Sequence, residues 1–393
     1  MSVNTLSFEQ VSTILNALHG QVTGQNAIAI TDTGSFISTA QVTLQAGYEP
    51  VLNSITQMVG RTIFYNRAYR GRLGLIQMDS QRWGYITRKL QIVDKPWEDE
   101  EAFNLTDGSS VDAYIVNKPE ILQTNFYGQN IVQRNYTIFK NQLDSAFTGP
   151  EEFGRFMAMV SQNCMDMIEQ KRETVRRMTL ANFIAGKIVA NNGIFHALTE
   201  YNSDTGGSYT ATTIMAAANF GPFCRWLYGK MSEISKMMEE RTGLFQIQIT
   251  GKELNRHTPA ADQRIFILSQ YMEQMRARVL ATTFNEGFLS MDRAESVAFW
   301  QDPQTPDEIK IKPVYLDGST GQLVTITADA NAVEQDAIIG IIFDRDAMGV
   351  TTMDETAAVT PMNASGLYWN QFYHFIERYY NDFTEKGVVF ILD

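Results

Sequence analysis

The sequence has few cysteines and histidines, the residues that most often mark disulfide frameworks, metal sites and nucleophilic catalysis. Its two cysteines, Cys164 and Cys224, are too few for a disulfide framework or a zinc site built on cysteines. Both lie in apolar stretches with helical spacing, which predicts buried free thiols. The four histidines are scattered, and none has a second histidine or cysteine at metal-ligand spacing. We therefore expect no metal and no cofactor.

The chain also lacks an excess of positive charge and long apolar runs. Its formal net charge of −12 argues against a protein that coats nucleic acid, because such proteins need a basic face. No run of about 18 apolar residues occurs, so no membrane-spanning helix is predicted. The N-terminus lacks the basic and apolar regions of a signal peptide. We expect a protein made and kept in a cytoplasm-like compartment, without a membrane partner.

Motifs of catalysis are missing too. Thr250-Gly251-Lys252 lacks the upstream glycine of a phosphate-binding loop, and no nucleophile elbow of the GxSxG type occurs. Asp344-Arg345-Asp346 follows an apolar run and is interpreted as a polar turn. We predict a protein that is not an enzyme, with no catalytic, cofactor-binding or metal residues. Catalytic residues can be far apart in a chain, so a soluble enzyme stays an alternative.

Several elements can be predicted along the chain. Residues 8–18 have helical spacing, whereas the polar, low-charge stretch 20–47 favours an extended arm with little core of its own. Pro150 near a first turn that also holds Glu151 and Glu152 starts a helix predicted to run to about Val189. At 1.5 Å per residue it would be a rod of about 60 Å. Its charged residues Lys171, Arg172, Glu173, Arg176 and Arg177 are predicted on the outer side.

The second half mixes helices and strands without regular alternation. The spacing predicts helices over 220–241 and 266–280 and a strand over 244–250. From Ile309 onward, short strands with turn signals follow in IKIKPVYL, LVTITA and AIIGIIFDRDAM. This order is typical of an α+β fold.

Between Arg67 and Tyr127 the composition becomes strongly charged, with short pieces that alternate like strands. One interpretation is a long surface hairpin with solvated charges. The other is a projecting loop whose charges meet complementary patches on a neighbouring chain. The candidate inter-subunit contact residues are Arg67, Arg70, Arg72, Arg82, Arg88, Lys89, Asp94, Glu98, Asp99, Glu100 and Glu101.

An aromatic segment lies near the end of the chain. Between Tyr368 and Phe383, eight of sixteen residues are aromatic, against 11% in the whole chain, and His374 lies in the middle. By spacing alone, Tyr368, Phe372, Phe375 and Tyr379 could form a helical stripe. The same residues would also suit a strand buried on both faces. Spacing leaves both possibilities open.

Two stretches carry a resemblance to a known family. YGQNIVQRNYTIFKNQLDSAFTGPEEFGRFM, leading into the long helix, and ASGLYWNQFYHF with the terminal GVVFILD resemble the major capsid proteins of tailed bacteriophages. The sequence is most similar to the major head proteins of phi29-like podoviruses, whose fold is the HK97-type capsid fold. The resemblance covers residues 127–188 and 363–392, and it rests on both segments occurring in the right order.

The resemblance implies an HK97-like division of the α+β chain. It would comprise an N-terminal arm (1–60), an E-loop with flanking peripheral-domain strands (61–130) and a peripheral domain with the spine helix (131–210). An axial domain (211–350) and a return to the peripheral sheet and C-terminus (351–393) would follow. It also favours a strand for the aromatic segment, with His374 packed or hydrogen-bonded there.

The implied function is assembly into the icosahedral shell that encloses the double-stranded DNA of a tailed phage. The implied partners are copies of the chain in pentamers and hexamers, scaffolding and portal proteins, and packaged DNA bound without sequence specificity. The implied location is the virion, after assembly in the host cytoplasm. An encapsulin-type nanocompartment shell, which encloses enzymes, is the alternative.

Overall fold

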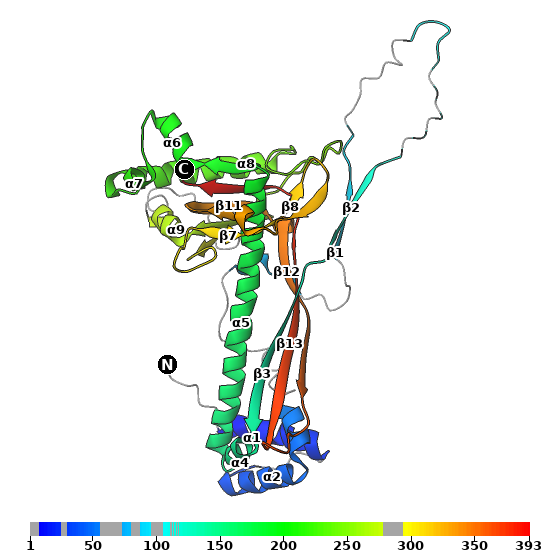
Figure 1. Ribbon diagram of the computed structural model, residues 1–393, viewed down its shortest axis with the longest axis vertical. Coiled ribbons are helices and arrows are strands. Elements are labelled where there is room, and N and C mark those ends of the chain that lie inside the picture. The colour runs from blue at the N-terminus through cyan, green and yellow to red at the C-terminus, as the bar shows by residue number, and fades with distance from the viewer. Residues whose placement is uncertain are drawn as a thin grey trace.

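A single long helix organises the molecule. The computed structural model describes residues 8–24, 30–55, 73–79, 87–95, 105–110, 112, 114, 116, 118–277 and 294–393, with the backbone alone for 157–165. Helix α5 (Pro150–Val189) begins and ends where the sequence predicted. One end of α5 carries a sheet with several helices and the other a smaller helical cluster, while a long narrow sheet runs beside it (Figure 1).

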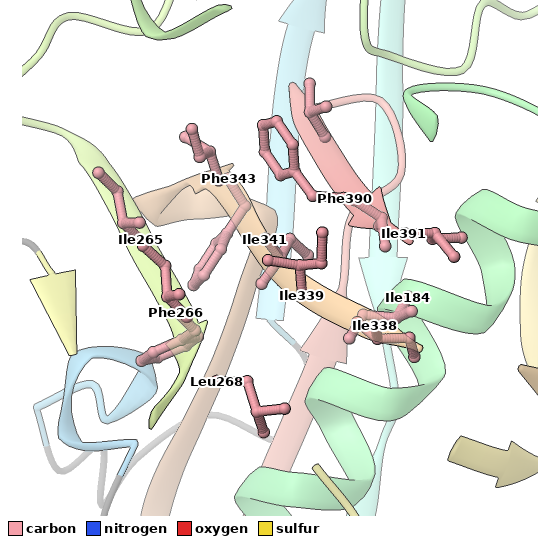
Figure 2. Close-up of a cluster of buried hydrophobic side chains, with 14 of the residues drawn as sticks. Ile184, Ile265, Phe266, Leu268, Ile338, Ile339, Ile341, Phe343, Phe390 and Ile391 are labelled. Atoms are coloured by element: carbon pink, nitrogen blue, oxygen red, sulfur yellow. The ribbon is translucent and has the colours of Figure 1, made fainter. Parts of the chain in front are cut away.

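The larger end is built on a five-stranded sheet in the order β4-β14-β11-β5-β6. Its strands are β4 (Ile194–His196), β14 (Gly387–Ile391), β11 (Ile338–Asp344), β5 (Gln263–Leu268) and β6 (Ala294–Val297). Helices α6 (Ala197–Thr205), α7 (Ala211–Ile214), α8 (Ala217–Glu239) and α9 (Ser269–Met275) lie around it (Figure 1). Every residue of β11 is buried, and its isoleucines pack with Phe266, Phe390 and Ile184 of α5 (Figure 2). This core therefore joins the end of the spine helix to the end of the chain.

The same end confirms some predicted elements and corrects others. Helix α8 confirms the prediction for 220–241. The strands predicted from Ile309 onward are confirmed by β7 (Ile309–Ile311), β8 (Val314–Asp317), β9 (Gln322–Thr325) and β11, whereas β10 (Val333–Gln335) was not predicted. The helix predicted over 266–280 is wrong at its start, because Phe266, Ile267 and Leu268 belong to the buried strand β5. The strand predicted over 244–250 is wrong as well. Phe245 has a φ of +65°, and the backbone N–H groups of Ile247 and Thr250 bond to Phe383 and Gly318, so no ladder forms.

A three-stranded antiparallel sheet lies along α5 in the order β12-β13-β3. Its strands are β12 (Met348–Val359), β13 (Tyr368–Asn381) and β3 (Gln129–Phe139). β13 confirms the strand prediction for the aromatic segment, with Trp369, Tyr373 and Phe375 buried on one face. His374 lies on the other face, half-buried and stacked beside Phe372 with ring centroids 6.3 Å apart. The segment is packing surface.

The far end of α5 carries a second apolar core. Helices α1 (Phe8–Thr23), α2 (Thr33–Gln45) and α4 (Lys140–Ala146) pack there with a helical stretch at 48–55. The extended arm predicted over 20–47 is therefore wrong within the described residues. Asp32 caps α2 by accepting a 2.7 Å bond from the Ser35 N–H, and Phe36 and Ala40, four residues apart, are fully buried. Tertiary packing outweighs the weak helical preference of this Thr- and Ser-rich stretch.

Between the two cores, the spine helix buries charge. Arg172, Glu173, Arg176 and Arg177 are all less than 9% exposed, so the outward position predicted for them is wrong, and only Lys171 faces solvent. Arg172 forms ion pairs with Glu355 on β12 and Glu377 on β13, the latter at 3.5 Å. The carboxylates of the long sheet thus explain why Arg172 turns inward, while Arg176 and Arg177 pair with Glu169 and Glu173 of the same helix.

Candidate assembly surfaces

A two-stranded hairpin projects from the molecule near the junction of the two sheets. Strand β1 (Thr87–Ile92) pairs antiparallel with β2 (Ile121–Phe126), and β3 follows β2 directly (Figure 1). Directly paired residues share one face of an antiparallel ribbon, so the register assigns each side chain to a face. Lys89 and Gln91 fall on the inner face with Leu122 and Thr124. Arg88, Leu90 and Ile92 fall on the outer face with Ile121, Gln123 and Asn125.

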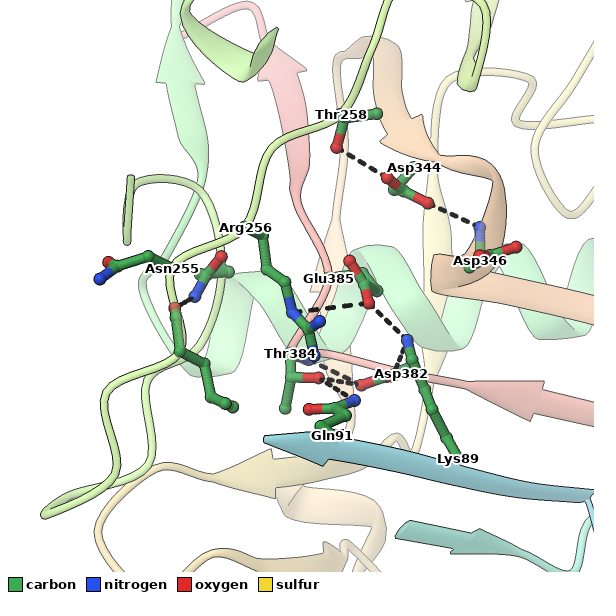
Figure 3. Close-up of polar contacts among 12 residues, drawn as sticks. Lys89, Gln91, Asn255, Arg256, Thr258, Asp344, Asp346, Asp382, Thr384 and Glu385 are labelled. Atoms are coloured by element: carbon green, nitrogen blue, oxygen red, sulfur yellow. Dashed lines mark hydrogen bonds and ion pairs between the residues drawn. The ribbon is translucent and has the colours of Figure 1, made fainter. Parts of the chain in front are cut away.

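The inner face is held to the body by an ionic clamp, which consists of Lys89, Arg256, Asp382 and Glu385. The ammonium of Lys89 donates to Asp382 Oδ2 at 2.6 Å and also to Glu385, and Arg256 Nε lies 3.6 Å from Glu385 Oε1 (Figure 3). Burial opposes the charge of Lys89, but the two carboxylates outweigh it and raise the pKa of Lys89. Burial raises the pKa of Glu385 despite the two cations beside it. The clamp joins β1 to the turn between β13 and β14.

A second contact holds the chain just beyond β1. Asp94 accepts a 2.7 Å bond from Arg241 Nη2 and a 2.9 Å bond from the backbone N–H of Asn255. The Asp94 N–H donates to the Glu253 carbonyl at 2.9 Å. Beside it, Lys252 Nζ lies 3.2 Å from Glu120 Oε1. The ribbon is thus fastened on both strands just beyond the end where Ile92 pairs with Ile121, which fixes its direction along the body.

The outer face has the opposite character. Leu90, Ile92 and Ile121 are 63%, 68% and 61% exposed, and Ile92 and Ile121 are direct cross-strand partners. Arg88 is exposed beside them. Three neighbouring aliphatic side chains on one face of a ribbon form an apolar strip of the kind that marks an interaction site. We call Leu90, Ile92 and Ile121 the aliphatic strip.

The structure places the sequence-predicted contact residues as follows. Arg88 is on the outer face, whereas Lys89 and Asp94 contact partners within the chain. The other candidates lie outside the described residues; they are Arg67, Arg70, Arg72, Arg82, Glu98, Asp99, Glu100 and Glu101. Sequence reasoning missed the aliphatic strip, although the alternation of Leu90 and Ile92 with polar residues was a usable signal. It could not have found Asp382 or Glu385, because they lie almost 300 positions away in sequence.

The side chains singled out for chemistry have structural roles. Buried His19 contacts the Thr43 hydroxyl at 3.0 Å, and His196 Nδ1 lies 2.6 Å from Asp393 Oδ1. Cys224 is buried, as predicted, and is not part of a disulfide; the Cys164 side chain lies outside the described residues. Asp344 accepts from Thr258 Oγ1 at 2.7 Å and from the Asp346 N–H at 2.8 Å, as in a polar turn (Figure 3).

Neither a metal cluster nor a membrane span emerges from the described part of the chain. Within those ranges, no group of three or more His, Cys, Asp or Glu side chains could hold a metal ion. Over the same ranges, no helix is both long enough and apolar enough to cross a bilayer.

Comparison with known proteins gives one family and one fold. The family model described as Phi29-like phage major capsid protein matches residues 11–391. The capsid structure of Staphylococcus phage Andhra contains a chain with 11% identity and a TM-score of 0.55, covering 84% of this chain and 86% of that one. A structure of the head fiber and inner core protein of native bacteriophage P68 contains one with 12% identity and a TM-score of 0.52, covering 83% and 86%. No curated protein matches. At these identities the similarity shows a shared fold, the HK97-like fold of phage capsids, which confirms the predicted fold class.

Proposed function

The chain belongs to the Phi29-like phage major capsid protein family, and we propose that its hairpin is the principal surface through which each copy binds a neighbour. Family membership makes the chain a subunit of a phage capsid shell, which assembles with copies of itself and is found in the virion. Because the matching family is one of phage capsid proteins, it favours a phage capsid and not an encapsulin-type shell. The proposal concerns how the shell is held together.

The observation that carries the proposal is the hairpin's two-faced construction. Its inner face is clamped to the body by Lys89, while its outer face presents the aliphatic strip and Arg88 to solvent. A ribbon that is fixed at its root but apolar on its outer face loses little conformational freedom when a second surface covers that face. Each subunit would make several such contacts at once, so a closed shell would be far more stable than any pair.

We assign the regions of the chain by the same division as the family fold. Residues 1–60 would be the N-terminal region, 61–130 the E-loop with flanking strands, 131–210 the peripheral domain and 211–350 the axial domain. Residues 351–393 would complete the two sheets, since β13 pairs in the long sheet and β14 in the five-stranded one. In this division, axial domains surround the five- and six-fold axes, and each E-loop lies over a neighbour's peripheral domain.

The proposal extends to the other partners of the shell. Scaffolding and portal proteins would join the copies during assembly in the host cytoplasm, and double-stranded DNA would be packaged inside without sequence-specific contacts. The net charge of −12 supports a lining from which DNA can slide, because like charges repel. The shell role itself requires no catalytic residue.

Electron microscopy of the purified protein, expressed alone and with a candidate scaffold, tests the proposal. Uniform hollow shells are expected from the wild type in at least one preparation. Charge reversal of the hairpin in an Arg82→Glu, Arg88→Glu variant should block shell formation while circular dichroism shows a folded subunit. Lys236→Glu, at an exposed position on α8, is the control and should assemble. Normal shells from the hairpin variant would contradict a charged contact there.

A further inference from the structure

A groove opens where β2 passes into β3. It has a volume of about 530 Å³ and lies between α5, the end of β13, the junction of β2 and β3, and the β8–β9 hairpin. Small-molecule sites in proteins usually have volumes of about 300–1,000 Å³ and mainly apolar walls. The groove has both properties, because its large side chains are apolar or aromatic; they include Phe126, Tyr127, Met178, Leu323 and Tyr379.

The walls of the groove are held in place by the fold. Asn182 of α5 donates from Nδ2 to the Val314 carbonyl at 2.9 Å and accepts from the Val314 N–H at 2.8 Å, which fastens β8 to the spine helix. On the opposite wall, the Tyr379 N–H donates to the Gly128 carbonyl at 3.2 Å. This approach is so close that a Cβ at Gly128 would lie 2.2 Å from the Tyr379 carbonyl oxygen. A ligand would therefore enter a preformed site, which lowers the cost of binding.

The groove contains a single charged side chain. Lys171, Thr174, Met178 and Asn182 follow one another at steps of three and four residues, so they lie along one face of α5. Of the described residues that line the groove, only Lys171 is charged at neutral pH, and the polar ones are amides and hydroxyls. The net charge of −12 is spread over the whole chain and is screened beyond about 8 Å at physiological salt. The nearby ammonium therefore favours a ligand with a negative charge at this end of the groove.

The lining also contains a hydrogen-bond acceptor without a partner. Asn381 donates from Nδ2 to the Thr179 carbonyl at 3.1 Å, but its buried Oδ1 accepts no hydrogen bond. An unpaired buried acceptor costs free energy, so a ligand with an N–H or O–H group beside its apolar part would gain a bond there. The rings of Phe126 and Tyr380 both line the groove, with centroids 5.0 Å apart. Aromatic walls favour a ligand with rings of its own.

We propose that the groove is a binding site for a small aromatic anion that carries an N–H or O–H donor beside its rings. The rings would lie against Met178 and Phe126, the anionic group would face Lys171, and the donor would bond to Asn381 Oδ1. A ligand in this position would contact α5, β13 and the β8–β9 hairpin at once, and would therefore stabilise the folded subunit. This inference goes beyond the proposed function and does not depend on it.

The dye anilinonaphthalene sulfonate tests the groove, because it combines aromatic rings, one N–H donor and one anionic group. Titration of the full chain should give a saturable rise in dye fluorescence, and the dye should raise the melting temperature seen by circular dichroism. Met178→Asp should abolish both effects, since it places a carboxylate among the apolar walls. Met237→Asp on α8 is the control, because Met237 is 40% exposed and Met178 42%. Unchanged binding by Met178→Asp, or equal loss in both variants, would overturn the proposal.

A second dye tests the preference for an anion. N-phenylnaphthylamine has the same rings and the same N–H donor but no sulfonate. Lys171→Gln should raise the dissociation constant of the sulfonate dye by up to about fivefold and leave that of the neutral dye unchanged. Lys236→Gln, at an exposed position on α8, is the control and should change neither constant. Equal weakening of both dyes by Lys171→Gln, or no weakening of either, would contradict the role of Lys171 and overturn the assignment of an anionic ligand.

Discussion

The ammonium of Lys89 on β1 lies 2.6 Å from the carboxylate of Asp382, 293 residues later in the chain. This contact makes the hairpin part of the folded subunit. Glu385 and Arg256 complete the clamp around it (Figure 3). The outer face of the hairpin therefore has a set direction within the subunit, which would lower the entropic cost of the proposed contact with a second copy.

Replacing Lys89 should weaken the subunit and loosen the hairpin. In Lys89→Met, buried Asp382 and Glu385 lose their main counter-charge, and we expect the free energy of unfolding to fall by about 3 kcal/mol. Hydrogen exchange should accelerate in β1 and β2 more than in β11. Arg88→Met, on the exposed face of the same strand, is the control and should change stability by less than about 0.5 kcal/mol. Equal exchange rates in both variants would contradict the clamp.

Glu377 should make stability depend on pH near neutrality. Burial raises the pKa of Glu377 from 4.5 to about 7, against the opposing effect of Arg172 and Arg176, and Glu169 and Glu355 raise it further. Between these two pH values the folded state binds the proton more tightly, so stability falls as pH rises through the window. The difference corresponds to about 3 kcal/mol.

In Glu377→Gln the amide imitates the neutral acid, so this fall should disappear. Urea unfolding at pH 5, 6, 7 and 8 measures the free energy of unfolding. Relative to the wild type, this free energy should increase in the variant as pH rises. The exposed Glu334→Gln serves as the control and should follow the wild-type curve. Parallel curves for Glu377→Gln and wild type would show that Glu377 does not titrate in this range.

Adding one methyl group to the spine helix should destabilise the larger core. A Cβ at Gly186 would lie 2.3 Å from the ring of Phe383, which stacks on Phe183 at 5.4 Å. We expect Gly186→Ala to cost about 1–3 kcal/mol from overpacking, even though alanine is the better helix former. Gly229→Ala in α8 meets no atom within 4 Å and should stabilise the protein by about 1 kcal/mol. Thermal melts of both variants and the wild type would measure these changes in stability. A higher melting temperature for Gly186→Ala than for the wild type would contradict the predicted overpacking.

Trp369 should hold the N-terminal helices to the long sheet. Its side chain is 1% exposed in the second core and stacks on Tyr48 with ring centroids 5.7 Å apart. Trp369→Ala is expected to cost about 3–5 kcal/mol and to open residues 8–55 to protease before the rest of the chain. Phe372→Ala, on the half-buried face of the same strand, should lower the free energy of unfolding by less than Trp369→Ala does. Cleavage that starts elsewhere would argue against this role.

The sequence alone predicted elements whose signals are local. The bounds of α5 follow from Pro150, two acidic residues in the first turn and a long apolar periodicity. The hairpin strands and the capsid family could also be predicted from sequence, the family through two stretches that contain β3 and part of β13 in the long sheet. α2 was missed because its stability comes from Phe36 packing with residues far away in sequence, although the Asp32–Ser35 capping pair was a usable local signal. The errors at 244–250 and 266–280 also have tertiary causes. Phe266 to Leu268 are buried in the sheet as part of β5, whereas the backbone of Ile247 and Thr250 bonds to Phe383 and Gly318 and not to a neighbouring strand.

Tertiary structure decided which face of each element is buried. Arg172 has the sequence of a solvated helix residue, yet it turns inward because Glu377 and Glu355 come from strands about 200 positions away. Lys89 and Leu90 are neighbours in a charged stretch, and only the position of Asp382 determines which of the two faces the body. The sequence therefore determined the elements and the family. The pairing of distant charges, which no local pattern records, decided which faces are buried and which remain exposed.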